Sequence, residues 1–341
     1  MSFTPRKVLV TGGAGFIGSN FIRYLLSKDL RVEVCNLDNV SYAGNESNLK
    51  NLPDPSRYEF VRGDICDRKL VDSLLRDHTI DTIIHFAAES HVDRSITGPA
   101  AFVQSNLVGT FVLLEAARSY WLEIEKWGQQ QCRFHHISTD EVYGSLLKEA
   151  APFTEKTAYA PNSPYSASKA GSDHMVRAYF HTYGLPVTTS NCSNNYGPYQ
   201  HGEKFIPTVI RSCLNQKPIP VYGDGSNIRD WLHVSDHCSA IDQIIRAGVL
   251  GETYNIGGDH ECSNIEIAKS ICALMDQKKP AKQSYENLIQ FVGDRPGHDW
   301  RYAINSEKLK MYLGWEPSID FKIGLDKTID WYVSNADYLK I

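Results

Sequence analysis

The chain has 341 residues, and its 42% hydrophobic and 22% charged residues are ordinary for a globular protein of one large or two modest domains. A formal net charge of -5 provides no basic footprint, so we expect no nucleic-acid partner. The eight cysteines form no Cys-x-x-Cys pair, and the N-terminal apolar run is too short for a signal peptide. With no run of about 18 apolar residues either, we expect a cytoplasmic protein with no membrane partner.

Short apolar runs alternate with helix-like stretches over the first half of the chain. The expected strands are residues 7–10, 31–37, 58–62, 81–86, 133–138 and 186–191. Residues 16–28, 99–118 and 166–183 carry the apolar periodicity of helices. This alternation predicts an α/β fold with a Rossmann-type, doubly wound parallel sheet.

After about residue 192, prolines and glycines interrupt the pattern. Residues 254–257 and 265–275 indicate a further strand and helix. We therefore expect a smaller C-terminal α+β domain that covers the substrate.

Three glycines, Gly12, Gly15 and Gly18, lie between the first strand and the first helix. Glycine permits a tight turn there and lets backbone amides approach a pyrophosphate at the helix N-terminus. The spacing is a variant of the dinucleotide-binding fingerprint, and an ordinary glycine turn is the alternative. Asp38 stands 20 residues after Gly18, where an acid hydrogen-bonds an adenosine ribose and repels a 2′-phosphate. The combination favours NAD over NADP.

The division expected on this basis is an NAD-binding domain at residues 1–191, with returning segments near 230–262. The substrate-binding region then takes residues 192–229 and 263–325, and residues 326–341 form a C-terminal tail. Two further strand ends, at residues 63–65 and 85–89, fit the same cofactor, because ligands of such sheets lie at the carboxyl ends of strands.

Thr139, Asp140 and Glu141 follow the strand at residues 133–138, so they should emerge at this same edge. Two adjacent carboxylates suit elimination of water, since close negative charges raise one pKa and allow one group to be the acid and the other the base. A solvated Asp-Glu pair in a loop is the alternative reading.

Tyr165 and Lys169 lie one helical turn apart and share a face. A Lys ammonium and a positive nicotinamide both favour the tyrosine phenolate, which makes Tyr165 a candidate base. Tyr-x-x-x-Lys alone is a weak signal, because Tyr24 and Lys28 repeat it.

Together these motifs resemble the extended short-chain dehydrogenase/reductase family, and within it most closely the dTDP-glucose 4,6-dehydratases. The resemblance covers nearly the whole chain and includes residues 87–95, 191–198 and 294–299. Related sugar-nucleotide decarboxylases and GDP-mannose dehydratases typically have Ser where this chain has Asp140. Sister epimerases or decarboxylases, UDP-glucose as substrate, and a catalytically silent NAD-binding regulator remain the alternatives.

The resemblance implies NAD-dependent conversion of a nucleotide-bound glucose to a 4-keto-6-deoxy sugar, a lyase step of deoxysugar biosynthesis. Tyr165 would deprotonate the 4-hydroxyl, which Thr139 orients, while C4 loses its hydride. Glu141 would then remove the C5 proton, and Asp140 would protonate the departing C6 hydroxyl. A homodimer through a helical interface is also implied.

The positions that match the family's cofactor contacts are Gly12, Gly15, Phe16, Ile17, Gly18, Asp38, Asn39, Ser41, Asp64, Ile65, Ala87, Ala88, Ser90, Ser105, Tyr165, Lys169 and Asn195. Those that match its substrate contacts are Ser90, Thr139, Asn194, Lys204, Phe205, Val221, Tyr222, Arg229, Asn264, Arg295 and His298. Arg229 and Arg295 are the expected diphosphate clamps. Asn39 replaces a usual Lys and Gly202 a usual Pro, which leaves the ribose contact and the nucleotide loop open. His233 and His237 have metal-like spacing but lie in a segment that the family uses structurally, so no metal is expected.

Overall fold

A seven-stranded parallel sheet forms the centre of the computed structural model, which describes residues 3–294 and 296–339. Its strand order is β10-β6-β5-β4-β1-β2-β3, and every neighbouring pair is parallel. The strands are β1 (Lys7–Thr11), β2 (Glu33–Asp38), β3 (Tyr58–Arg62), β4 (Thr82–His85), β5 (Arg133–Thr139), β6 (Val187–Cys192) and β10 (Thr253–Ile256). The predicted α/β, doubly wound architecture is confirmed.

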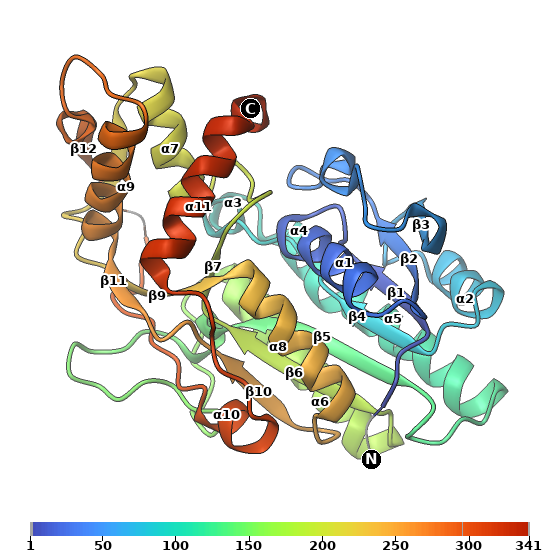
Figure 1. Cartoon of the computed structure of the whole chain (residues 1–341). Helices are drawn as coiled ribbons and strands as arrows, with labels where there is room; N and C mark the ends of the chain where they lie inside the picture. Colours follow the sequence, from blue (N-terminus) through green and yellow to red (C-terminus); the bar gives the residue numbers. More distant parts are fainter. Residues whose placement is uncertain (1–2, 295, 340–341) are drawn as a thin grey trace.

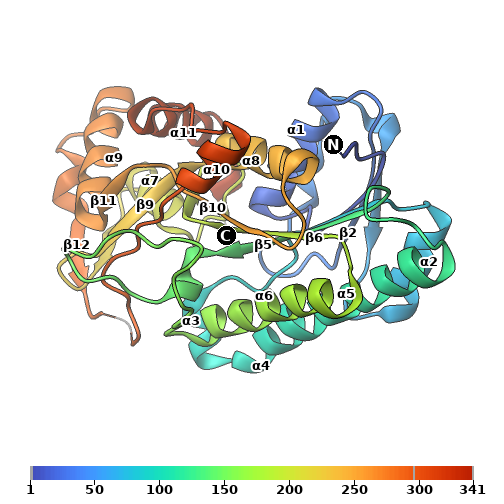
Figure 2. The ribbon, with the colours of Figure 1, turned by 90° about the horizontal axis from the view of Figure 1, so that it is seen from below.

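Helices cover both faces of this sheet, as Figures 1 and 2 show. On one face, α1 (Phe16–Lys28) and α8 (Val234–Ala247) pack together in a core that includes Leu25 and Ile241. On the other face lie α2 (Arg68–Asp77), α5 (Thr110–Ala117) and α6 (Pro164–Tyr183), which share a second core. The expected helix at residues 16–28 is confirmed in full, and α6 begins two residues earlier than expected.

The expected helix at residues 99–118 is longer and less regular than its sequence suggests. After α3 (Val92–Thr97), helical structure runs continuously over Pro99–Ile124, with π-helical turns on both sides of α5. Its length and mean hydropathy would suit a membrane span, yet half of its most apolar stretch is buried against the rest of the protein. It packs on α2 and α6, as a core helix does.

The C-terminal half builds a separate core beside the sheet. The helices α7 (Phe205–Asn215), α9 (Asn264–Lys278) and α11 (Phe321–Ser334) surround it. A small sheet in the order β11-β9-β7 (Glu261–Ser263, Ile228–His233 and Asn194–Tyr196) and the parallel pair β8 (Ile219–Tyr222) and β12 (Ile289–Val292) complete it. The short helix α10 (Glu307–Leu313) packs near β10.

The chain crosses between these two regions more than once. From the C-terminal half, α8 and β10 return to the main sheet, where β10 pairs with β6. Residue 326 lies inside α11, which contacts α9 and α7. These crossings place the C-terminal region over the carboxyl ends of the central strands (Figure 1).

Candidate active site

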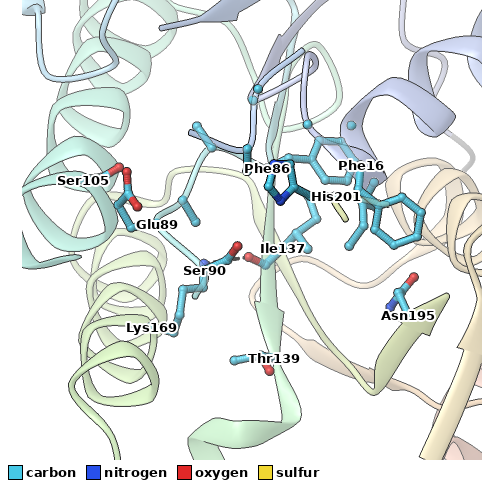
Figure 3. A pocket seen from close by; sticks show the side chains of 18 of the residues that line it. Phe16, Phe86, Glu89, Ser90, Ser105, Ile137, Thr139, Lys169, Asn195 and His201 are labelled. Atoms are coloured by element: carbon cyan, nitrogen blue, oxygen red, sulfur yellow. Dashed lines mark hydrogen bonds between the residues drawn. The ribbon is translucent and has the colours of Figure 1, made fainter. Parts of the chain in front are cut away.

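A cavity lies at the carboxyl ends of β1, β2, β4, β5 and β6, where the sheet faces the C-terminal region. Figure 3 shows side chains from several elements converging on it, with Lys169 on one side and Phe16 and His201 on another. The lining includes Gly12, Asp38, Ala87, Thr139 and Cys192, each at or next to a strand end. This is the place where an open α/β sheet binds its ligands.

The turn between β1 and α1 requires glycine at position 12. Gly12 has a φ of +75°, and a Cβ atom there would lie 2.5 Å from the backbone nitrogen of Ala87. Gly15 is the N-cap of α1 and also lines the cavity, so the helix N-terminus faces it. Backbone close to the cavity and a helix N-terminus together fit a pyrophosphate.

Asp38 is the last residue of β2, and its side chain holds the backbone of the turns that follow β1 and β2. Its carboxylate accepts hydrogen bonds from the backbone nitrogens of Ala14 at 2.8 Å and Val40 at 2.7 Å. Burial raises the pKa of this carboxyl, and the two backbone donors lower it. Because Asp38 lines the cavity beside the glycine turn, its carboxylate could accept hydrogen bonds from the hydroxyls of an adenosine ribose, the role that the sequence suggests for it.

Nearly all predicted cofactor positions line this one cavity. They are Gly12, Gly15, Phe16, Ile17, Gly18, Asp38, Asn39, Ser41, Ile65, Ala87, Ala88, Ser90, Ser105, Tyr165, Lys169 and Asn195. Asp64 does not line it: the side chain is exposed, and its carboxylate accepts a hydrogen bond from the Cys66 backbone nitrogen at 2.8 Å.

The catalytic tyrosine and lysine candidates stand at the start of α6. Ser163 and Ser166 form a reciprocal capping box that fixes the first turn, and Pro164 occupies the first helical position. Lys169 is buried, and its Nζ donates to the Ile137 carbonyl at 2.8 Å. Burial lowers the pKa of Lys169 to about 8, although the charge of Asp173 raises it.

Tyr165 lies in surroundings that oppose ionisation of its phenol. Burial, followed by the charge of Glu141, raises its pKa well above 10, and a hydrogen bond with Thr139 only partly offsets this. Burial thus favours the protonated phenol, because a phenolate there would have little water to stabilise its charge. A neighbouring ammonium and a positive nicotinamide would act in the opposite direction, so the role of Tyr165 as a base stays a prediction.

Thr139, Asp140 and Glu141 emerge together at the end of β5, as predicted, and all three line the cavity. Asp140 is 2% exposed, and its Oδ2 has no hydrogen-bond partner among the described residues. Thr139 Oγ1 donates to its Oδ1 at 3.4 Å. Burial, and then the charge of Glu141, raises the pKa of Asp140 well above 3.8. These surroundings favour a protonated carboxylic acid beside a second carboxylate.

The second Tyr-x-x-x-Lys copy lies elsewhere. Tyr24 packs against the core between α1 and the sheet, and neither it nor Lys28 lines the cavity. Burial raises the pKa of Tyr24 to about 12. The structure thus separates the two copies, so Tyr-x-x-x-Lys spacing alone does not place a tyrosine in the cavity.

The predicted substrate positions fall into two groups. Ser90, Thr139, Asn194 and Lys204 line the cavity, and Lys204 Nζ donates to the Ser90 carbonyl at 2.9 Å. The positions outside its lining are Phe205, Val221, Tyr222, Arg229, Asn264 and His298. Arg295 lies outside the described residues.

Two of the outer positions contact each other. The rings of Tyr222 and His298 are 6.1 Å apart, and Tyr222 Oη donates to Asp93 Oδ2 at 3.3 Å.

Arg229 is 5% exposed and donates to the backbone carbonyls of Ile228 and Asp299, at 2.6 and 2.9 Å. The charge of Arg229 lowers the pKa of Asp140, so its guanidinium lies near the candidate acid as well as holding the chain around residue 299. Its role as a diphosphate clamp stays a prediction.

Several cavity residues carry no individual assignment from the sequence. Phe86 and Glu89 lie in the strand-end segment 85–89 that the sequence indicates, and Cys192 ends β6, a position that could have marked it. Gln200 and His201 come from the loop before α7, and no local pattern marks them.

The metal-like histidine pair has structural contacts instead. His233 caps α8 by accepting from the Ser235 backbone nitrogen at 3.2 Å, and His237 Nδ1 lies 2.9 Å from Asn195 Oδ1. Over the part of the chain that the structure describes, no cluster of three potential metal ligands occurs.

Comparison with known proteins adds to this geometry. The model of the GDP-mannose 4,6 dehydratase family matches residues 9–328. A curated dTDP-glucose 4,6-dehydratase of Xanthomonas campestris pv. campestris (strain B100) is 56% identical over 334 residues, covering 97% of this chain and 94% of the relative.

Solved structures give a consistent result. The dTDP-glucose 4,6-dehydratase DesIV from Streptomyces venezuelae, crystallised with NAD bound, has a TM-score of 0.88 at 44% identity and covers 98% of each chain. A UDP-glucose 4-epimerase from Thermotoga maritima has a TM-score of 0.84 at only 26% identity, covering 96% of this chain and 99% of the epimerase. The fold is shared by both activities, whereas sequence identity is higher with the dehydratase.

Proposed function

This chain belongs to the GDP-mannose 4,6 dehydratase family, and we propose that within it the chain is a dTDP-glucose 4,6-dehydratase. It converts dTDP-glucose to dTDP-4-keto-6-deoxyglucose and water with NAD as its cofactor. The observation that carries this proposal is the buried Asp140 carboxyl beside Glu141 at the end of β5. An epimerase or decarboxylase on the same fold has no C6 hydroxide to expel and needs no such acid.

The first stage is oxidation at C4 of the glucose. Thr139 orients the 4-hydroxyl, and Tyr165 takes its proton once positive charge beside the phenol has lowered the pKa that burial raises. Lys169, one turn along α6, supplies one such charge. Bound NAD supplies a hydride acceptor for this stage and a hydride donor for the last one.

The second stage is elimination of water. The 4-keto group acidifies the C5 proton, which Glu141 removes as the base. Asp140 donates its proton to the departing C6 hydroxyl, and its unpartnered Oδ2 leaves room for this contact. Proton transfer by positioned groups of this kind typically contributes about 10²–10⁴-fold to the rate. Glu141 then returns a proton to C5 as C6 is reduced.

The residues around the cavity fit the cofactor. The turn containing Gly12 and the N-terminus of α1 would hold the pyrophosphate, and Asp38 would bind the adenosine ribose. We assign the substrate's diphosphate to Arg229 and Arg295, and its sugar end to Ser90, Thr139, Asn194 and Lys204.

The test is incubation of the NAD-loaded protein with dTDP-glucose and, separately, UDP-glucose, followed by the alkaline absorbance of a 4-keto-6-deoxy product. We expect product from both but a kcat/KM about 10–200-fold higher for dTDP-glucose, since one methyl group in a fitted pocket contributes about 1–3 kcal/mol. A preference for UDP-glucose would reassign the substrate. If neither substrate gives this product, or if the product is a C4 epimer, the assignment as a dehydratase is refuted.

We also propose that the protein is a cytoplasmic homodimer. In support, Val103 and Phe111, on the long helical segment Pro99–Ile124, are 48% and 43% exposed. Together with α6 this segment offers two long helices that could pack against those of a second copy.

A further inference from the structure

A group of buried polar side chains that do not line the cavity packs against Lys169. His136, on β5, is fully buried, and Asp173, one turn after Lys169 on α6, is 5% exposed. Lys169 and Asp173 share a helix face because they are four residues apart. The reaction described above uses neither His136 nor Asp173, although a buried carboxylate is costly to maintain.

His136 lies between the lysine and the carboxylate. Its Nε2 is 3.5 Å from Lys169 Nζ and 3.1 Å from Asp173 Oδ1. The other carboxylate oxygen, Oδ2, accepts hydrogen bonds from Ser138 Oγ at 2.8 Å and from Tyr159 Oη at 3.0 Å. His136 Nε2 also lies 3.2 Å from Ser172 Oγ. Two hydroxyl donors on one oxygen suit an ionised Asp173, because a carboxylate is acceptor-only and a protonated acid is not.

The charges of the groups around Lys169 follow from their surroundings. His136 on β5 and His85 on β4 have pKa values well below 6.5 because both are buried, and burial also raises the pKa of the Cys192 thiol on β6. These three groups are therefore neutral near pH 7. Burial raises the pKa of Asp173 to about 6, so it is ionised there. Of the groups named, Asp173 alone brings negative charge to Lys169.

We propose that Asp173 is a positioning residue of the active site: acting across His136, it provides the buried counter-charge that keeps Lys169 an ammonium ion. This inference rests on the proposed function, in which Lys169 is the positive neighbour of Tyr165. Ser138 and Tyr159 hold the carboxylate, and His136 fills the space between the two charges, with Nε2 in contact with both Lys169 Nζ and Asp173 Oδ1.

The test is the pH dependence of C4 oxidation, followed as NADH formation in a single turnover of NAD-loaded protein with dTDP-glucose. In Asp173→Asn, Lys169 should lose its proton at lower pH, because the charge that opposes the effect of burial is gone. We expect the alkaline limit of the pH profile to move down by about one pH unit, the smaller end of the effect of a nearby opposite charge. A lower amplitude with an unmoved alkaline limit would overturn the proposal.

Two matched variants separate charge from packing. Asp173→Glu keeps the negative charge and should restore the wild-type alkaline limit at least in part. Tyr159→Phe removes one hydrogen bond to Asp173 but leaves its charge, so its alkaline limit should stay at the wild-type pH. A shift in Tyr159→Phe as large as in Asp173→Asn would show that packing, and not charge, sets the limit.

A measurement on the unaltered protein covers the case in which Asp173→Asn does not fold. The Lys169 Nζ signal, in protein labelled with ¹⁵N at lysine side chains and assigned with Lys169→Met, should titrate near pH 8 and show a second, smaller step near pH 6, where Asp173 ionises. Absence of that second step would contradict the proposal. Because this experiment uses no substrate, its outcome does not depend on the dehydratase assignment.

Discussion

Asp140 and Glu141 are neighbours in the chain, yet the fold gives them different surroundings. Asp140 is almost fully buried, whereas Glu141 is only half-buried. The resulting rise in the pKa of Asp140 keeps its proton available at a pH where an exposed aspartate would have lost it. Activity that depends on this acid should therefore fall as pH rises through that elevated pKa.

Replacing Asp140 with Asn should separate the two stages of the reaction. We expect Asp140→Asn to lower kcat by about 10²–10⁴-fold while C4 oxidation proceeds nearly as in the wild type, since only elimination needs the proton. NADH should accumulate during turnover, which stopped-flow absorbance would detect. Equal slowing of NADH formation and of product release would refute the assignment of Asp140 as the acid.

At the scale of elements, the position of the site residues depends on where β5 ends and where α6 begins. Thr139 is the last residue of β5 and so lies at the sheet edge, and the capping box at Ser163, two residues before Tyr165, sets the start of α6. A change in the cap should therefore affect the position of Tyr165 as well as stability.

A pair of cap substitutions tests this coupling. Ser163→Ala and Ser263→Ala each remove the serine of a reciprocal capping box, at α6 and α9 respectively. Each should lower stability by about 1 kcal/mol, measured by denaturant unfolding. Only Ser163→Ala should also lower the rate of C4 oxidation, by about tenfold, because misplacement of a reacting group is costly. The same loss of rate in Ser263→Ala would show that the effect is general destabilisation.

Local patterns predicted the central elements well. The strands ended within one or two residues of the expected positions, because apolar runs and the glycine turn are encoded in adjacent residues. The π-helical turn at Val103–Gly109 could not be predicted, since its sequence reads as ordinary helix. This turn places Asn106 so that its Nδ2 donates to Ser168 Oγ at 2.8 Å and to the Glu89 carbonyl at 3.0 Å.

The other features that the sequence did not predict also depend on residues far apart in the chain. The small sheet and the β8–β12 pair join segments far apart in the chain, and no local pattern reports such pairing. The protonation state of Tyr165 depends on burial, which one sequence motif does not reveal. The five candidate catalytic residues could be proposed from the sequence because they lie at a strand end or in the first two turns of a helix. The outer substrate positions were proposed only through family resemblance.

At the scale of the whole molecule, the long helical segment Pro99–Ile124 connects the catalytic site to the outer surface. Phe102 packs its ring against Tyr165, with centroids 6.3 Å apart, while Val103 and Phe111 are exposed. If a second copy covers the exposed residues, the dimer interface and the catalytic tyrosine share one segment of backbone.

A charge on this surface should dissociate the proposed dimer. We expect Phe111→Glu to weaken association at least about 100-fold, equivalent to about 2.7 kcal/mol, because a carboxylate would be buried in an apolar contact. Light scattering across a dilution series would measure this. The control is Leu30→Glu, since Leu30 is 79% exposed at a distant turn after α1. A monomeric wild type, or equal weakening by both variants, would contradict the helical interface.

The return of α8 and β10 to the main sheet has a consequence for how the molecule can be divided. A fragment that stops near residue 191 would lack both elements, so β6 would become an open sheet edge and the apolar face of α1 would lose the helix that covers it. Open edges and bare apolar faces promote aggregation. We therefore expect residues 1–191 not to fold on their own, and truncations that cut the chain there should yield insoluble protein.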